Sequence, residues 1–320
     1  MAKQKLTLLH FLLHAAIFYA PAFSATFTLT NNCTYTVWPG LLSGAGTAPL
    51  PTTGFALPPS ESRSLPMPSS WSGKLWGRTL CTQDPQTSIF TCATGDCNTG
   101  TLECPGGNAA IPATLAEFTL SGSAAAQDFY DVSLVDGYNL PILISPVGGS
   151  GPNCTNTGCA SDLNKPCPTD LRVNSESDGR VAVACKSACG AFDKPEFCCQ
   201  GAFGSPDTCK PSTYSEMFKS ACPRAYSYAY DDKTSTFVCG SSPDYVITFC
   251  PSSSSAAASV RPKNWDNGTS PAVGGGYDWN GKMVYDGLDM MSSGGRRHVY
   301  GRYSAAGLMA LWMLSWMGRV

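Results

Sequence analysis

Cysteine is the residue type whose chemistry must be decided first in this chain. Three cysteines fall within residues 90–104, FTCATGDCNTGTLEC, with the spacing C-x4-C-x6-C and not the C-x2-C pairs of zinc ribbons. The chain has 16 cysteines, an even number, and all of them lie between Cys33 and Cys250. Such a density requires an oxidising compartment if the thiols are to stay paired. We therefore expect disulfides here, and not metal ligands or catalytic thiolates.

Histidine chemistry is excluded by the positions of the three histidines. His10 and His14 lie in a predicted signal peptide, and His298 lies in a predicted C-terminal propeptide. The processed protein then has no imidazole for a Ser-His-Asp triad, a Cys-His pair or a metal site. No metal and no cofactor are expected, and carboxylates remain for acid–base chemistry.

The N-terminus has the organisation of a secretory signal peptide. Two lysines precede an apolar run that ends at Tyr19, and Ala22 and Ser24 place small residues at the −3 and −1 positions. The alternative, a transmembrane helix, needs roughly 20 apolar residues, and this run is shorter. We predict a signal peptide over residues 1–24 and a secreted protein.

The C-terminus resembles the attachment signal for a glycosylphosphatidylinositol (GPI) anchor. Ser293 is followed by two glycines, the polar spacer RRHVYGRYS and the apolar run AAGLMALWMLSWMG. A small site, a spacer of roughly 8–12 residues and a tail of roughly 10–20 form that signal. Arg319 departs from the pattern, since such tails usually end in apolar residues. We predict attachment at Ser293 and removal of residues 294–320; a sorting propeptide and a peripheral amphipathic tail are the alternatives.

Processing makes the chain acidic. The two predicted cleavages remove basic residues only, which leaves 15 basic and 23 acidic residues and a net charge of −8. This charge disfavours nucleic acid and anionic lipid as partners. We therefore expect no nucleic-acid binding, membrane attachment only through a lipid anchor, and a neutral or cationic ligand.

Residues 251–293 have the composition of a low-complexity spacer. They begin with PSSSSAAAS and continue as a Gly-rich stretch without cysteine. The repeated NWDNG and YDWNG suggest, as an alternative, a small aromatic contact site for carbohydrate. Sequons for N-glycosylation occur at Asn32, Asn153 and Asn267. A cysteine is the middle residue of the first two, and its early disulfide hides the asparagine, so Asn267 is the expected acceptor.

Residues 25–250 are predicted to form one mainly β unit. Short alternating stretches such as TFTLTNN, YTVWPG, EFTLSG, FYDVSLV and YVITFC are separated by turn residues, which indicates a sandwich or barrel. The DGYN segment at 136–139 predicts a hairpin turn. Between Cys154 and Cys222, nine cysteines fall in 69 residues, and PSTYSEMFKSACP is the only extended helical pattern. That part is expected to be a loop-rich subdomain held by disulfides.

Six segments resemble successive signatures of the thaumatin-like, or osmotin-like, pathogenesis-related proteins of plants: LWGRTLC, FTCATGDCNTGTLEC, PATLAEFTL, FYDVSLVDGYNLPI, FCCQGAF and CPRAYSYAYDDKTSTFVC. The resemblance covers residues 25–250 and all 16 cysteines in order, and the 251–320 extension is similar to that of membrane-anchored members. It implies a flattened β-sandwich with a small stapled loop subdomain at 79–108 and a disulfide-rich subdomain at 160–222. It also implies eight disulfides: Cys33–Cys250, Cys81–Cys92, Cys97–Cys104, Cys154–Cys239, Cys159–Cys222, Cys167–Cys185, Cys189–Cys198 and Cys199–Cys209.

The resemblance further implies an acidic cleft between the sandwich and the disulfide-rich subdomain. Carried over by motif, its residues are Arg78, Glu117, Asp131, Asp136 and Asp231, with Asp232 as a neighbour that can be mistaken for Asp231. Asp131 and Asp136 are an odd number of residues apart, so a regular strand would point them to opposite faces. Both can face the cleft only if Asp136 lies in the turn. Without the family pattern, a solvated turn or a salt bridge explains each carboxylate.

The function that the resemblance implies is defence at the cell surface or in the extracellular space, as a monomer. Family members bind β-1,3-glucan, some hydrolyse it weakly and several are antifungal. Paired carboxylates can supply an acid and a base or nucleophile for glycosidic cleavage, and we expect Glu117 to be the acid and Asp136 its partner. A non-catalytic module that recruits a basic protein or a membrane partner, and a structural or sensory surface protein, are the alternatives.

The predicted anchor can be tested directly. The apolar run at 305–318 is 14 residues, which gives about 21 Å as a helix against a hydrocarbon core of roughly 30 Å. Phosphatidylinositol-specific phospholipase C should therefore release the protein from membranes. If the protein stays bound and a peptide that contains Trp312 and Trp316 is detected in it, the propeptide or tail interpretation replaces the anchor.

Overall fold

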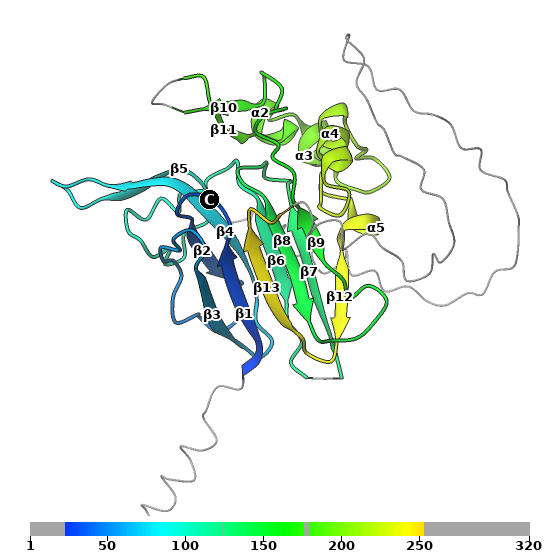
Figure 1. Ribbon diagram of the computed structural model, residues 1–320. Helices are drawn as coiled ribbons and strands as arrows, with labels where there is room; N and C mark the ends of the chain where they lie inside the picture. The colour runs from blue at the N-terminus through cyan, green and yellow to red at the C-terminus, as the bar shows by residue number, and fades with distance from the viewer. Residues whose placement is uncertain (1–22, 124, 176–178, 253–320) are drawn as a thin grey trace, which may run out of the picture. The chain divides into compact units, whose positions relative to one another are not determined.

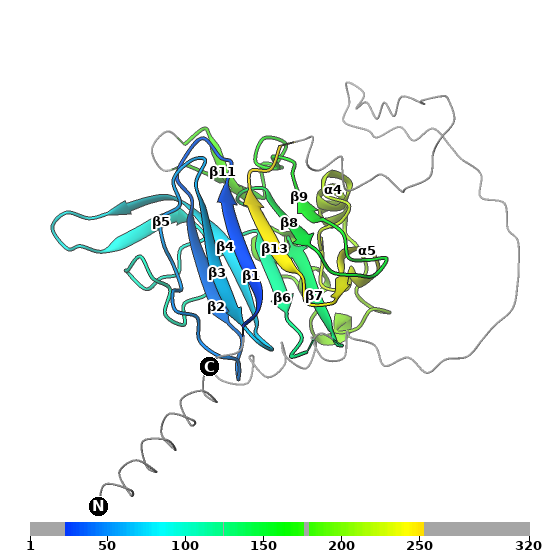
Figure 2. The same cartoon turned by 60° about the horizontal axis from the view of Figure 1, so that its bottom comes forward.

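The computed structural model describes residues 23–123, 125–175 and 179–252, which form two facing β-sheets and a disulfide-rich region beyond one end of the strands (Figure 1). The first sheet has the order β3 (Ser62–Pro68), β1 (Phe23–Asn31), β13 (Asp244–Phe249), β8 (Ile142–Val147), β9 (Thr157–Cys159). The second has the order β12 (Phe237–Gly240), β7 (Gln127–Ser133), β6 (Leu115–Thr119), β4 (Ser72–Gln83), β2 (Trp38–Ser43). β5 (Phe90–Thr94) pairs with the end of β4, and the two extend to the side of the sheets (Figure 2). The predicted sandwich is confirmed.

An aromatic cluster fills the space between the two sheets. The ring centroids of Phe27 on β1 and Phe118 on β6 lie 4.4 Å apart. Tyr245 on β13 lies 5.1 Å from Phe118 and 5.2 Å from Tyr130 on β7. None of these four side chains is more than 3% exposed. Because successive residues of a strand point to opposite faces, this packing decides which residues of β6 and β7 point outward.

The first and last strands of the fold are neighbours. β1 and β13 pair in parallel up to Asn31 and Phe249, near the centre of the first sheet. The disulfide between Cys33 and Cys250 follows directly after the paired ends and joins residues 217 positions apart. Both ends of the folded region are therefore fixed to each other by main-chain hydrogen bonds and by a covalent bond.

The described part of the disulfide-rich region and of the segment after it contains short elements only. These are β10 (Arg172–Asn174), β11 (Ala182–Cys185), α2 (Ala188–Phe192), α3 (Pro195–Cys198), the 3-10 helix η1 (Gly201–Phe203), α4 (Thr213–Ala221) and α5 (Asp232–Ser235). α4 is the helix that the sequence predicts, and it begins with a capping box formed by Ser212 and Ser215. None of the helices in the described part of the chain has the length and apolar character needed to cross a membrane.

All eight disulfides implied by the family resemblance are present, and no cysteine among the described residues is free. Asn32 and Asn153 are exposed, each beside a disulfide-bonded cysteine. Residues 1–22 of the predicted signal peptide, Asn267, Ser293 and the rest of 253–320 lie outside the described residues.

The predicted hairpin at DGYN is wrong, although the turn itself is present. The N–H of Gly137 donates to the carbonyl of Leu134 at 2.9 Å, and Gly137 has a φ of 92°. However, β7 and β8, which flank the turn, belong to different sheets. Tyr138 exchanges two main-chain hydrogen bonds with Cys185, at 2.8 and 2.7 Å. The chain is thus held against the disulfide-rich region before it enters the first sheet.

The Cys33–Cys250 disulfide should contribute more to stability than the short disulfides. Replacing both cysteines by alanine should lower the free energy of unfolding by about 5 kcal/mol, because the chain-entropy contribution increases with the length of the closed loop. The Cys81–Cys92 pair, 11 residues apart, is the matched control, and its loss should lower the free energy by about 3 kcal/mol. Denaturant unfolding of both variants measures this order, and the reverse order would contradict it.

Candidate functional site

A row of charged side chains crosses the second sheet on the face opposite the aromatic cluster. Lys74 on β4 is directly opposite Glu117 on β6, and Glu117 is directly opposite Asp131 on β7. Opposite residues of antiparallel strands have Cβ atoms roughly 4.5–5.5 Å apart, so neighbouring side chains in the row interact. We call Lys74, Glu117 and Asp131, together with Asp136, the charged row.

Asp136 reaches the charged row because it lies beyond the end of its strand. β7 ends at Ser133, and Asp136 sits in the turn that follows. Its carbonyl accepts a hydrogen bond from the N–H of Ala113 at 3.2 Å, which ties the turn to the residues before β6. Asp136 interacts electrostatically with Glu117 and with Lys74. The expectation that Asp136 lies in the turn is confirmed.

Burial shifts the titration of every carboxyl group in the row. Burial raises the pKa of Glu117. The charge of Lys74 lowers this pKa, and the charge of Asp136 raises it further. Burial also raises the pKa of Asp136, against the same lysine. The pKa of Asp131 is raised well above its usual value by burial and by the carboxylates of Glu117 and Asp232. These groups therefore keep protons at pH values where exposed carboxyls are ionised.

Asp131 is the deepest member of the row. Its side chain is 2% exposed, and within the described residues its Oδ1 has no hydrogen-bond partner. A buried carboxyl oxygen without a partner favours the neutral form of the group. Asp131 lies beside Glu117 on the neighbouring strand and is too deeply buried to contact a ligand.

Arg78 does not join the row. Its side chain is 1% exposed and donates to three main-chain carbonyls, those of Trp38 at 2.9 Å, Pro39 at 3.2 Å and Leu102 at 2.6 Å. Burial lowers the pKa of Arg78 to about 10, against the charges of Asp96 and Glu103. Arg78 thus fastens β2 and the loop at 97–104 to β4.

Lys74 is the site residue that the sequence interpretation missed. It is half-buried and stands on β4 four residues before Arg78, so the two side chains project from the same face of the strand. The even spacing within KLWGR was the available signal. The register of β4 against β6 decides whether Lys74 or Arg78 lies beside Glu117. Local spacing in the sequence does not predict that register.

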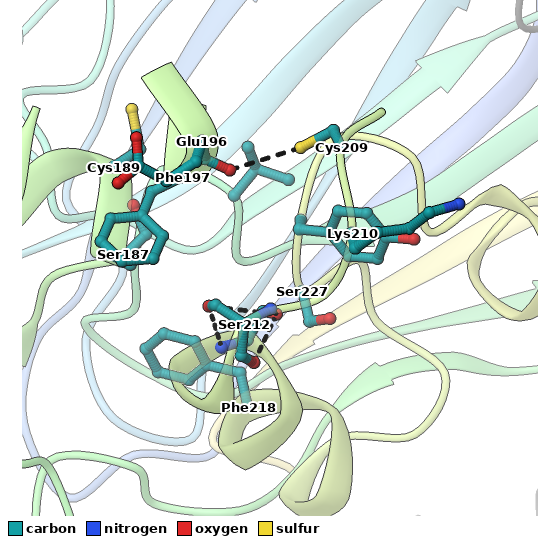
Figure 3. Close-up of a pocket in the computed structure, with 13 residues that line it drawn as sticks. Ser187, Cys189, Glu196, Phe197, Cys209, Lys210, Ser212, Phe218 and Ser227 are labelled. Carbon is teal, nitrogen blue, oxygen red and sulfur yellow. Dashed lines mark hydrogen bonds between the residues drawn. The ribbon is translucent and has the colours of Figure 1, made fainter. Parts of the chain in front are cut away.

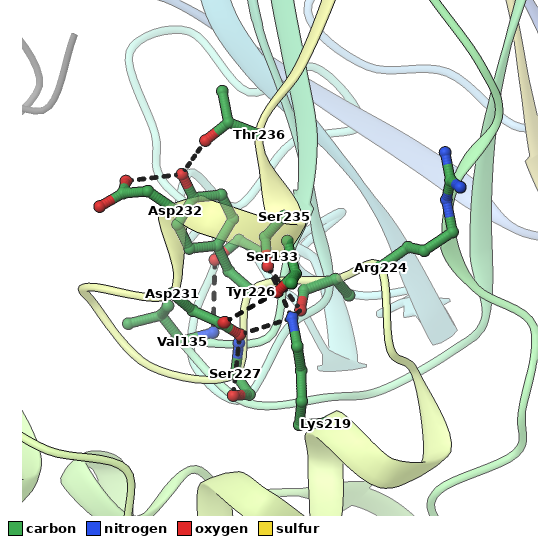
Figure 4. A network of polar contacts seen from close by, with 12 residues as sticks. Ser133, Val135, Lys219, Arg224, Tyr226, Ser227, Asp231, Asp232, Ser235 and Thr236 are labelled. Atoms are coloured by element: carbon green, nitrogen blue, oxygen red, sulfur yellow. Dashed lines mark hydrogen bonds and ion pairs between the residues drawn. The ribbon is translucent and has the colours of Figure 1, made fainter. Parts of the chain in front are cut away.

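Asp231 takes part in a polar network with residues around Tyr226 and with Lys219 (Figure 4). It forms an ion pair with Lys219 at 2.8 Å and accepts hydrogen bonds from the N–H and hydroxyl of Ser227, both at 3.0 Å. Asp232, the neighbour set aside in the sequence interpretation, adds to the rise in the pKa of Asp131 that burial and Glu117 produce. It accepts a hydrogen bond from the Tyr226 hydroxyl at 2.8 Å.

A pocket opens beside the row, between α4 and the segments around Cys189 and Cys209 (Figure 3). None of the five residues expected in the cleft lines it. Across the described part of the chain, no three His, Cys, Asp or Glu residues are grouped so that they could hold a metal ion.

A two-sheet sandwich stapled by eight disulfides, with carboxyl groups gathered on its outward face, defines the class of thaumatin-like proteins. The model of the Thaumatin family matches residues 31–251, and the chain belongs to this family. It is 55% identical over 249 residues to Thaumatin-like protein 1 of Arabidopsis thaliana, covering 77% of this chain and 93% of that protein. It is 56% identical over 230 residues to Pathogenesis-related thaumatin-like protein 3.5 of Cryptomeria japonica, covering 72% and 91%.

A third relative is a larger protein. The chain is 49% identical over 261 residues to the PR5-like receptor kinase of Arabidopsis thaliana, covering 81% of this chain but only 39% of the kinase. The match therefore covers less than half of that protein.

The raised pKa of Asp131 predicts how stability depends on pH. The proton held by Asp131 stabilises the fold below its ordinary pKa of about 3.9, and this contribution is lost as pH rises through the raised folded-state pKa. Asn cannot ionise, so Asp131→Asn should be more stable than the wild type at pH 7 and equally stable at pH 3. Each unit of pKa shift corresponds to about 1.4 kcal/mol.

Asp84 provides a control of opposite sign for that measurement. Hydrogen bonds from Thr87 and the N–H of Gln86 lower the pKa of this exposed carboxylate. Asp84→Asn should therefore lose stability at pH 7 and match the wild type in acid. Urea unfolding from pH 3 to pH 8 tests both variants, and a constant difference at Asp131 across that range would refute the assignment.

Proposed function

We propose that this protein is an extracellular, defence-type protein that binds β-1,3-glucan of fungal or plant walls along the charged row. The observation that carries the proposal is the alignment of Lys74, Glu117 and Asp136 on one outward face. A protonated carboxyl and an ammonium donate hydrogen bonds, and an ionised carboxylate accepts them. Sugar hydroxyl groups do both, so a neutral polyhydroxy chain satisfies the row better than an ion would.

The same groups support a weak endo-β-1,3-glucanase and antifungal activity. Burial raises the pKa of Glu117 and of Asp136, Lys74 opposes the rise at both carboxyls, and the charge of Asp136 adds to the rise at Glu117. In the proposed mechanism Glu117 carries a proton and Asp136 is ionised. Glu117 donates that proton to the glycosidic oxygen, while Asp136 acts as the base or nucleophile on the other side of the bond.

The protein is proposed to act at the cell surface as a monomer. A signal peptide over residues 1–24 directs secretion, and a lipid at Ser293 holds the 25–250 domain through the spacer at 251–293. The family membership and the eight disulfides support an extracellular location.

A second candidate is a non-catalytic sensory module that recruits a basic protein through the charged row. The match to a PR5-like receptor kinase favours it, because the aligned part makes up only 39% of that protein. A domain of this kind therefore also occurs as one part of a receptor.

Substitution of Glu117 separates the candidates. Glu117→Gln keeps the size of the side chain but removes the acid, so release of reducing ends from linear β-1,3-glucan should fall about 100- to 10,000-fold. Sedimentation with insoluble glucan should change little. Glu61→Gln, which removes an exposed carboxylate outside the row, is the matched control and should leave both assays unchanged.

Each outcome of these assays has a distinct meaning. Equal turnover in wild type and Glu117→Gln would remove Glu117 from the mechanism. Glucan binding without turnover in the wild type would leave a binding protein, and the absence of both would favour the sensory module.

A further inference from the structure

Asn32 is an exposed asparagine that begins an acceptor sequence for N-glycosylation, NCT. It follows β1 directly, and its main-chain N–H donates to the carbonyl of Phe249 at 3.0 Å. The neighbouring Asn31 is buried, and its side-chain amide donates to the carbonyls of Tyr35 and Leu57 at 2.9 and 2.8 Å. The turn after β1 is therefore built on the side chain of Asn31, and Asn32 stands exposed beside it.

Asn153 begins a second sequence of the same kind, in the loop between β8 and β9, and it is also exposed. Its main-chain carbonyl accepts hydrogen bonds from the hydroxyl of Tyr130 at 3.4 Å and from the N–H of Thr155 at 3.0 Å. The hydroxyl of Thr155, which the acceptor sequence requires, accepts a hydrogen bond from the guanidinium of Arg224. Because this hydroxyl is engaged in the folded loop, a glycan at Asn153 has to be added before the loop folds.

The cysteine inside each acceptor sequence has a disulfide partner far downstream. Cys33 pairs with Cys250, 217 residues later, and Cys154 pairs with Cys239, 85 residues later. Five of the other six disulfides join residues between 7 and 18 positions apart. At about 5–20 residues per second, synthesis reaches Cys250 roughly 11–43 s after Cys33, and Cys239 roughly 4–17 s after Cys154. Both cysteines therefore lack their partners while the asparagines before them enter the secretory pathway.

We infer that Asn32 and Asn153 are modification sites that carry N-linked glycans, added while Cys33 and Cys154 are still unpaired. The inference rests on the proposed secretion of the protein. The sequence interpretation assumed early disulfides, whereas the connectivity places both partner cysteines late in synthesis. Both asparagines lie next to strands of the first sheet, while the charged row lies on the second. The two glycans are thus not attached to the face proposed to bind glucan.

The test is translation of the full chain with microsomes that contain oligosaccharyltransferase, followed by peptide N-glycosidase and mass mapping of each acceptor peptide. The glycosidase converts a glycosylated asparagine to aspartate, and it should do so at Asn32 and Asn153 in most chains. Thr34→Ala and Thr155→Ala should each remove one glycan, which is seen as one step in gel mobility. Thr34→Ser and Thr155→Ser keep the acceptor sequence, so these matched controls should keep both glycans.

Two cysteine variants test the order of the two reactions. Cys250→Ser and Cys239→Ser each leave the cysteine of one acceptor sequence without its partner. If the glycan is added first, occupancy of the neighbouring asparagine should equal that of the wild type. A rise in occupancy in these variants would show that the disulfide forms first and would overturn the inferred order. Because the glycans are scored on newly made chains, a variant that does not complete folding still gives a result.

A second chain, in which an established secretion signal replaces residues 1–24, separates this inference from the secretion on which it rests. Glycans at Asn32 and Asn153 in the second chain alone would support the modification sites and refute secretion through residues 1–24. If either asparagine stays unmodified in the second chain after it has entered the microsomes, the inference is overturned at that position, whatever the natural N-terminus does.

Discussion

The packing of aromatic rings between the two sheets is the constraint on which the candidate site depends. Phe118 and Tyr130 point inward toward Phe27 and Tyr245, so the alternate residues of β6 and β7 point outward. A register slip of one residue would turn the carboxyl groups toward the space between the sheets and the rings away from it. The core, and not polar contact within the row, holds the site in place, since Asp131 Oδ1 has no hydrogen-bond partner within the described residues.

Two cations on one face of β4 have different tasks. The planar guanidinium of Arg78 satisfies three carbonyl groups at once, which makes its burial tolerable. The ammonium of Lys74 is not committed in this way and adjusts the pKa of both Glu117 and Asp136. An arginine suits the structural position because its fork matches several acceptors, and a lysine suits the row because it acts as a point charge.

Much of this architecture could be predicted from the sequence. The part that could not be predicted consists of contacts between segments that lie far apart along the chain. Alternation within EFTLSG and FYDVSLV predicts two of the strands, and the family resemblance implies the disulfides through the order of the cysteines. Local sequence patterns do not predict which strands pair with each other when they are far apart along the chain. DGYN predicts a turn correctly but cannot say that the next strand joins the other sheet.

The same limit applies to the two adjacent aspartates. Asp231 and Asp232 have nearly the same local sequence environment, and only the tertiary positions of Lys219 and Tyr226 assign one to an ion pair and the other to the neighbourhood of Asp131.

The disulfide between Cys33 and Cys250 determines what happens when a protease cuts this protein once. The chain between these two residues is a closed covalent ring, and seven further bridges subdivide it. Hydrolysis of any single peptide bond within the ring opens the ring but releases no fragment, because both new ends remain joined through the disulfide. A protein cut once in an exposed loop therefore loses no residue, and its mass increases by that of one water molecule. Its two sheets remain packed around the same core.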